Sequence, residues 1–183
     1  MKKNILVGVC GGIASYKTCE LVRLLVKKGF LVKVMMTEAG TKFVTPLVFQ
    51  NLSNDIVYID LFQVLKAKNP QHISLAQWAD LVVLAPLSAN TLSKLAGGIC
   101  DNLLSVVVCA LPGKTKVLLA PAMNENMWKN PIIQENVSKL KKIKKYLIMS
   151  PVKGELACGV DGEGRMPEAE EIYRKIMSNF QLP

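Results

Sequence analysis

His72 is the residue best suited to acid–base chemistry in this sequence. It is the only histidine, and imidazole is the side chain whose ordinary pKa, about 6.5, suits proton transfer near neutrality. The residue stands shortly before an apolar run, Leu81 to Ala85. A lone histidine just before a buried strand is more often a structural residue than a catalyst, so catalysis by His72 is a hypothesis that other residues must support.

Two asparagines follow similar strand ends. The apolar runs at residues 81–85 and 116–120 each stop at an Ala-Pro pair and lead to an asparagine, Asn90 or Asn124. On neighbouring parallel strands both junctions would line one crevice at the carboxyl edge of the sheet, where ligands bind in open α/β folds. The alternative interpretation is a strand–loop–helix junction in which Ser88 or Asn90 caps a helix. The first junction offers small polar groups from Ser88, Ala89, Asn90 and Thr91.

Cys158 lies in a glycine-rich segment, residues 154–164. Such a segment, between a predicted last strand at 146–150 and a predicted final helix at 168–179, is typical of a mobile flap. A thiol in the core usually matters only for packing. A thiol among glycines is harder to explain in that way, so the position of Cys158 favours a functional role.

The elements that must position these residues alternate as in an α/β protein. Residues 4–10 predict a strand, a helix follows and stops at Gly29, and residues 30–36 predict a second strand. This βαβ unit predicts a parallel, right-handed crossover. The uniformly apolar later strands are typical of a sheet buried on both faces. We predict one domain over residues 1–183, a three-layer α/β/α Rossmann-like (flavodoxin-like) parallel sheet.

Composition limits the function. No apolar run approaches the ~20 residues that span a bilayer, and the start lacks a signal-peptide cleavage site, so we expect a cytoplasmic protein without a membrane partner. Five cysteines without a C-x-x-C pair, and a single histidine, predict no metal site. The net charge of +9 could help to gather anionic substrates. No nucleic-acid motif is present, and a lysine cluster at residues 139–145 fits a solvated helix end.

The first glycine turn indicates a phosphate-binding loop of limited size. The glycines read Gly8-x-x-Gly11-Gly12 and do not form G-x-G-x-x-G, and the second strand does not end directly in an acidic residue. A dinucleotide site is therefore disfavoured. A glycine turn at a helix N-terminus, with hydroxyls in Ser15 and Thr37, suits a mononucleotide, although a tight turn for packing explains the glycines equally well.

Several segments together resemble the flavin-dependent cysteine decarboxylases. The resemblance runs over nearly the whole chain, and the segments occur in order and at the family's spacing, which makes the set specific although each is weak alone. They are Gly11-Gly12-Ile13-Ala14, His72 ahead of Ala79-Asp80, Pro86-Leu87-Ser88-Ala89-Asn90-Thr91, Gly98-x-x-Asp101-Asn102-Leu103-Leu104, Pro121-Ala122-Met123-Asn124-x-x-Met127-Trp128 and Leu156-Ala157-Cys158-Gly159.

The resemblance implies FMN as cofactor and a reaction in which the substrate thiol is transiently oxidised to a thioaldehyde, so that CO2 can leave. It implies His72 as the base, Asn124 as the carboxylate-binding amide and Cys158 as the proton donor. Further substrate contacts are implied for Asn124, Met127, Ala157 and Arg165. FMN is expected against Gly11, Gly12, Ile13, Ser15, Thr37, Phe43, Ser88, Ala89, Asn90 and Thr91.

The resemblance also implies partners. Members of this family assemble as trimers or dodecamers with active sites between subunits, and the branch that acts on a phosphorylated cysteine derivative in coenzyme A synthesis is the best match. The alternatives are a peptidyl-cysteine decarboxylase of the same family and a non-catalytic FMN-binding regulatory subunit. A flavin prenyltransferase shares the fold, but His72 and the Pro-Ala-Met-Asn sequence at 121–124 count against it.

Overall fold

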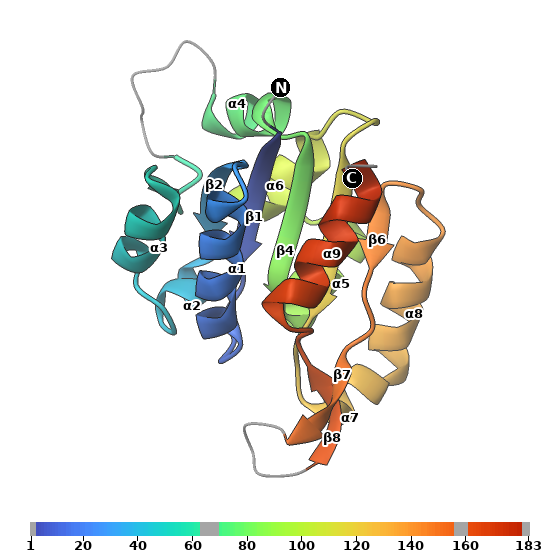
Figure 1. Cartoon of the computed structure of the whole chain (residues 1–183). Coiled ribbons are helices and arrows are strands. Elements are labelled where there is room, and N and C mark those ends of the chain that lie inside the picture. Colours follow the sequence, from blue (N-terminus) through green and yellow to red (C-terminus); the bar gives the residue numbers. More distant parts are fainter. Residues whose placement is uncertain (1–2, 63–69, 156–160, 181–183) are drawn as a thin grey trace.

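A six-stranded parallel sheet forms the centre of the protein (Figure 1). The computed structural model describes residues 3–62, 70–155 and 161–180. The strands are ordered β3-β2-β1-β4-β5-β6, which is the Rossmann order and not the 2-1-3-4-5 order of flavodoxin. The Rossmann-like prediction is confirmed. The bounds are β1 Asn4–Val9, β2 Leu31–Met36, β3 Val57–Tyr58, β4 Leu81–Leu87, β5 Lys116–Pro121 and β6 Tyr146–Ile148.

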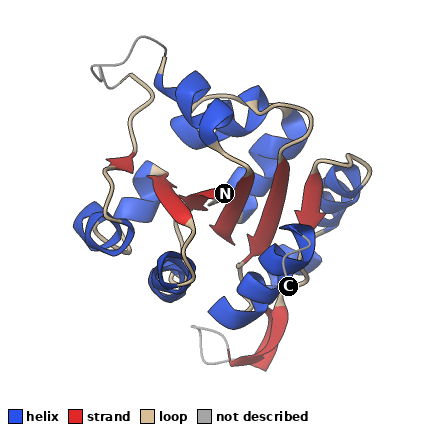
Figure 2. Cartoon of the chain, turned by 45° about the horizontal axis from the view of Figure 1, so that its top comes forward, coloured by secondary structure: helices blue, strands red, loops and turns tan. Residues whose placement is uncertain are grey.

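Helices cover both faces of the sheet, so the structure has the three predicted layers (Figure 2). On one face lie α1 Ser15–Lys27, α3 Pro46–Ser53 and α9 Ala169–Phe180. On the other lie α4 Gln71–Trp78, α5 Ala89–Gly97, α6 Leu103–Ala110 and α8 Pro131–Lys141. Two short helices, α2 Glu38–Thr41 and α7 Glu125–Lys129, follow β2 and β5. Within the described ranges, no helix is both long enough and apolar enough to cross a membrane.

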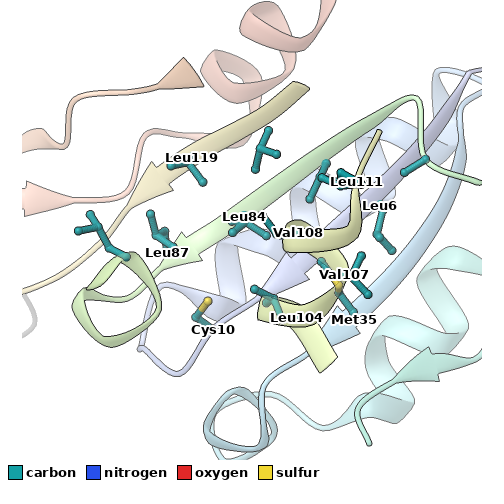
Figure 3. Close-up of a cluster of buried hydrophobic side chains, with 14 of the residues drawn as sticks. Leu6, Cys10, Met35, Leu84, Leu87, Leu104, Val107, Val108, Leu111 and Leu119 are labelled. Carbon is teal, nitrogen blue, oxygen red and sulfur yellow. The ribbon is translucent and has the colours of Figure 1, made fainter. Parts of the chain in front are cut away.

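Strand β4 is the most deeply buried element, because both helical layers pack on it. All of its residues are buried, and successive side chains point to opposite faces: Val82 and Leu84 join the cluster with α4 and α6, while Leu81 and Val83 join the cluster with α1 and α9. Figure 3 shows the first cluster, with Leu84 beside Leu104 and Val108 of α6. A strand covered on both faces has no reason to alternate polar and apolar residues, which explains the continuous apolar run.

The helix after β4 begins with a side-chain cap. Ser88 Oγ accepts a hydrogen bond of 3.3 Å from the Thr91 backbone N–H, so Ser88 is the N-cap of α5. The helix α6 has a complete capping box, in which Asn102 Oδ1 accepts from Ser105 N and Ser105 Oγ accepts from Asn102 N. Of the two caps that the sequence analysis considered for the first helix, Ser88 and Asn90, the structure uses Ser88.

The segment after β6 contains two strands that the sequence analysis did not predict. Residues Val152–Glu155 (β7) and Asp161–Arg165 (β8) pair as an antiparallel hairpin. The expectation that residues 146–150 form the last strand is therefore wrong. Glycines at 154, 162 and 164 remove the side-chain alternation by which a strand is identified.

Candidate functional site

A cavity of about 620 Å³ lies at the carboxyl edge of the sheet. This volume is within the range of small-molecule and cofactor sites, and the location is where ligands bind in doubly wound sheets. The loops after β1, β4 and β5 form its wall together with the end of β8. The lining residues are Gly11, Gly12, Ile13, Ala14, Tyr16, Lys17, Ser88, Ala89, Ala122, Met123, Asn124, Met127, Gly164, Arg165 and Met166.

The glycine turn between β1 and α1 is held by close contacts. A Cβ on Gly11 would lie 2.7 Å from the Cβ of Ala39, so only glycine allows this loop to approach α2. The Ser15 hydroxyl lies 2.7 Å from the Gly12 carbonyl and 3.1 Å from the Cys10 carbonyl, and can donate to either. A Cβ on Gly12 would have only one neighbour, Pro86 at 3.9 Å, so Gly12 faces open space. The turn is thus packed on one side and open on the other.

The loop after β4 lies over a buried thiol. Burial raises the pKa of Cys10, and hydrogen bonds with Thr91 and Ser88 oppose that shift in part. The thiol therefore stays protonated at neutral pH beneath the loop, consistent with a structural role. Cys10 also fixes the loop through its backbone, because its N–H donates to the Pro86 carbonyl at 3.2 Å.

Asn124 is positioned by the helix that it starts. Its Oδ1 accepts a hydrogen bond of 2.9 Å from the Asn126 backbone N–H, which caps α7. With Oδ1 engaged, the amide presents its NH2 group as a hydrogen-bond donor. Nearby, a hydrogen bond from Lys129 lowers the pKa of Glu125, so this carboxylate stays ionised.

The end of β8 is attached to two other parts of the cavity wall. The Met123 N–H donates to the Gly164 carbonyl at 3.0 Å, which ties β8 to the loop after β5. Glu168, just before α9, accepts hydrogen bonds from Lys17 Nζ at 2.5 Å and from Arg165 Nη2 at 3.5 Å. Lys17 belongs to α1 and is only 7% exposed. The hairpin base is therefore linked to α1 through one carboxylate.

The cavity brings together part of the predicted site. Five of the ten residues predicted to bind the cofactor line it, namely Gly11, Gly12, Ile13, Ser88 and Ala89, and so do Asn124, Met127 and Arg165. Ala157 and Cys158 lie outside the described residues. The other five predicted cofactor residues are not among those that line it. Ser15, Thr37 and Thr91 make hydrogen bonds within their own turns, whereas Phe43 and Asn90 are exposed.

His72 is not among the residues that line the cavity. It is the second residue of α4, and α4 ends just before β4 begins, at the amino edge of the sheet. Figure 1 shows α4 beside the N-terminus, at the opposite end of the sheet from α7 and the β7–β8 hairpin. One copy of the chain therefore keeps His72 apart from Asn124.

Some lining residues were not among the predicted site residues. Tyr16 and Lys17 follow the glycine turn within the first turn of α1, and Met166 follows Arg165. The signal that could have found Lys17 is its place near a helix start where a phosphate was expected. The other missed residues are Ala14, Ala122, Met123 and Gly164.

The donor set of this cavity fits a flat, phosphorylated cofactor such as a flavin mononucleotide. Ile13, Met123 and Met127 offer apolar surface to a ring system, while the open side of Gly12 lets a ligand approach the backbone. Lys17 and Arg165 supply positive charge at the rim. Among the residues that the structure describes, no group of His, Cys, Asp and Glu could hold a metal ion.

Comparisons with known proteins match the chain over almost its full length. The family described as "Flavoprotein" matches residues 1–181. A Streptococcus mutans protein named "Probable phosphopantothenoylcysteine decarboxylase" is 45% identical over 179 residues, covering 96% of this chain and 98% of that protein. The "Coenzyme A biosynthesis bifunctional protein CoaBC" of Borreliella burgdorferi is 42% identical over 178 residues, 97% of this chain but 45% of that protein. The chain thus spans less than half the length of such bifunctional relatives.

Solved structures agree with this match. A mutant of PPC decarboxylase complexed with pantothenoylaminoethenethiol superposes with a TM-score of 0.88 at 32% identity, covering 99% of this chain and all of the other. The structure titled "The FMN binding protein AtHal3" superposes with a TM-score of 0.84 at 31% identity, covering 99% of this chain and 98% of the other.

Proposed function

The chain belongs to the flavoprotein family, and we propose on that basis that it is an FMN-dependent decarboxylase of 4′-phosphopantothenoylcysteine, forming 4′-phosphopantetheine for coenzyme A synthesis. The observation that carries the proposal is the 45% identity to a probable phosphopantothenoylcysteine decarboxylase that the chain matches nearly from end to end. The cavity at the carboxyl edge of the sheet supports it, since its volume lies in the range of cofactor sites and its lining combines apolar and cationic side chains.

FMN would be held by the glycine turn and by the loop after β4, through Gly11, Gly12, Ile13, Ser88 and Ala89. When bound, FMN supplies a two-electron acceptor, the electron sink that a simple amino-acid carboxylate lacks. The protein supplies orientation around it. The close contact between Gly11 and Ala39 and the hydrogen bonds of Ser15 keep the turn in one conformation before a ligand arrives.

Asn124 would bind the carboxylate that is lost as CO2. A carboxylate only accepts hydrogen bonds, so it needs a donor. The cap on α7 engages Oδ1 of Asn124 and leaves the NH2 group as that donor. Met127, one turn further along, would pack against the substrate at the same side of the cavity.

His72 would act as the base that removes the substrate thiol proton. General base catalysis of this kind contributes typically ~10²–10⁴-fold. Because α4 lies at the amino edge of the sheet, away from Asn124, we propose that His72 serves the cavity of a neighbouring copy. This arrangement requires a homo-oligomer, and a trimer, alone or within a dodecamer, is the assembly that the family resemblance implies.

Cys158 would protonate the ene-thiolate that remains after CO2 has left, and the two electrons removed from the substrate would return to it to give the saturated product. An ordinary thiol has a pKa of about 8.5 and is mostly protonated at neutral pH, as a donor must be. Its role is implied by the resemblance of the Ala157-Cys158-Gly159 segment, and the proposal is supported by the described base of the hairpin, where Gly164 and Arg165 line the cavity.

The direct test is chemical. Purified protein should be yellow, with an FMN spectrum, and should convert 4′-phosphopantothenoylcysteine into 4′-phosphopantetheine, as seen by mass analysis. Protein that binds no FMN after reconstitution, or holoprotein that leaves this substrate unchanged, would refute the proposal. A peptide ending in cysteine, offered in parallel, tests the peptidyl alternative.

The shared site is tested by mixing variants. His72→Asn and Asn124→Ala proteins should each bind FMN but release almost no CO2. When the two are unfolded and refolded together, mixed oligomers contain some cavities with both native residues, so part of the activity should return. If the mixture stays as inactive as its components, His72 does not act across subunits.

A further inference from the structure

Two cations that line the cavity, Lys17 and Arg165, share one carboxylate oxygen of Glu168. Glu168 Oε1 accepts a hydrogen bond from Lys17 Nζ at 2.5 Å and a longer one from Arg165 Nη2 at 3.5 Å. The lysine side chain is 9% exposed and the arginine side chain 37%. Glu168 is thus bound mainly by the buried lysine, and Arg165 is its weaker partner.

The side chain of Arg165 is held in place by the hairpin itself. A Cβ on Gly154 would lie 2.6 Å from Arg165 Nη1, so the guanidinium passes directly over the backbone of β7 at a glycine. The φ of Gly154 is +149°, a conformation that other residues rarely adopt. Arg165 also lines the cavity, as does Lys17.

Lys17, Arg165 and Glu168 together carry a net charge of +1. If Glu168 bound Arg165 closely, that arginine would be neutralised and its N–H donors occupied. Because Lys17 holds Glu168 at the shorter distance, the donors of Arg165 that Glu168 does not use can face a ligand. Guanidinium groups bind phosphate through two parallel hydrogen bonds.

The geometry points to Lys17 as a positioning residue that binds Glu168 and so keeps Arg165 available for a phosphate monoester in the cavity. The inference rests on the proposed function, in which both the cofactor, FMN, and the substrate carry such a group. Arg165 would contact the phosphate, whereas Lys17 would act through Glu168. Either phosphate could be the one bound, and the two are separated by the choice of ligand.

The test measures binding by calorimetry, so that it does not depend on turnover. One ligand pair is FMN and riboflavin, titrated into apoprotein; the other is 4′-phosphopantetheine and pantetheine, titrated into FMN-loaded protein. In Lys17→Met, Glu168 is expected to close on Arg165. The affinity for the phosphorylated member of one pair should then fall about fivefold, equivalent to about 1 kcal/mol, and its unphosphorylated counterpart should be unaffected. The affected pair identifies the phosphate.

A second background shows whether Lys17 acts through Arg165. In Arg165→Gln protein, the additional Lys17→Met change should alter the affinity less than twofold, because the group that it controls is gone. An equal loss in both backgrounds would overturn the inference, since Lys17 would then act by itself. An equal loss for the phosphorylated and unphosphorylated ligands, or no loss at all, would also overturn it.

Glu168→Gln gives a result of opposite sign and serves if Lys17→Met does not fold. Removing the competing carboxylate should raise the affinity for the phosphorylated ligand, because no anion then competes for Arg165. A fall would mean that Glu168 acts only as a structural tether, and an unchanged affinity would mean that it does not compete for Arg165; either result contradicts the inference. The matched control is Lys94→Met. It breaks the 2.6 Å ion pair between Lys94 and Asp101, neither of which lines the cavity, and it should change no affinity.

Wild-type protein separates this inference from the proposed function. If wild-type protein binds neither FMN nor 4′-phosphopantetheine, the proposed function fails. If it binds them and the Lys17 and Glu168 variants behave like Lys94→Met, the positioning role fails while the proposed function stands.

Discussion

Gly164→Ala tests whether the base of the hairpin positions the cavity wall. Gly164 lies in β8, and its carbonyl accepts a hydrogen bond of 3.0 Å from the Met123 N–H. A Cβ at this position would lie 2.1 Å from the carbonyl oxygen of Met123 and 3.4 Å from the Glu125 nitrogen. Both neighbours are backbone atoms of the loop that carries Asn124, so no flexible side chain can move aside.

The size of the displacement follows from that contact. Cβ atoms essentially never approach other atoms closer than 3.0 Å, so the separation of 2.1 Å must grow by about 0.9 Å. Misplacing a catalytic group by about 1 Å can cost on the order of 100-fold in rate. Losing the single hydrogen bond costs only about 1 kcal/mol of unfolding free energy, which for a chain of this length lowers Tm by roughly 2–4 °C. Activity should therefore fall far more than stability.

The assay compares kcat/KM for the decarboxylation with the thermal midpoint of the same preparation. We expect a loss of roughly 10- to 100-fold in kcat/KM, with FMN still bound. Gly113→Ala is the matched control, because a Cβ there meets nothing within 4 Å. Activity of Gly164→Ala within twofold of that control would show that the strand does not set the position of Asn124.

Three further predictions concern stability and ligand binding. Phe49→Ala should lower the unfolding free energy by about 3–5 kcal/mol in urea titrations, because the Phe49 side chain of α3 is fully buried against the sheet. The control Phe62→Ala, at a residue that is 82% exposed, should leave the unfolding free energy nearly unchanged. Asn102→Ala should cost about 1 kcal/mol through loss of the α6 capping box, and Asn102→Ser should recover most of it. FMN at about 100 times its Kd should add about 2.7 kcal/mol to the unfolding free energy of the apoprotein and raise its Tm by roughly 5–11 °C. An unchanged Tm would argue against a specific cofactor site.

The central strands could be predicted from the sequence because burial on both faces leaves a clear pattern. Leu81–Leu87 and Lys116–Pro121 have no polar alternation, and each is followed by a turn and a helix. The hairpin could not be predicted in this way, because β7 and β8 carry glycines where side chains would alternate. Those glycines are explained by contacts between distant parts of the chain, such as Gly164 against Met123, which no local pattern records.

The hydroxyl residues of the site show a second limit of sequence analysis. Thr37 and Thr91 were predicted to contact the cofactor, and within this chain the Thr37 hydroxyl accepts from the Gly40 N–H while the Thr91 hydroxyl accepts from the Ser88 hydroxyl. A hydroxyl after a strand suits a helix cap as well as a ligand, and the sequence does not distinguish the two uses. Glycine positions are more informative here, since Gly11 and Gly12 were predicted at the cavity and do line it.

His72 and Asn124 show why a site can be identified from sequence before its geometry is understood. Both residues belong to segments that resemble one family, yet α4 precedes β4 and Asn124 follows β5, so the fold places them at opposite edges of the same sheet. In a parallel sheet the residue that precedes a strand and the residue that follows one cannot meet within a copy unless a long loop returns between the edges. If both residues act on one substrate, the second copy is part of the active site, and association of the subunits is then a condition for catalysis.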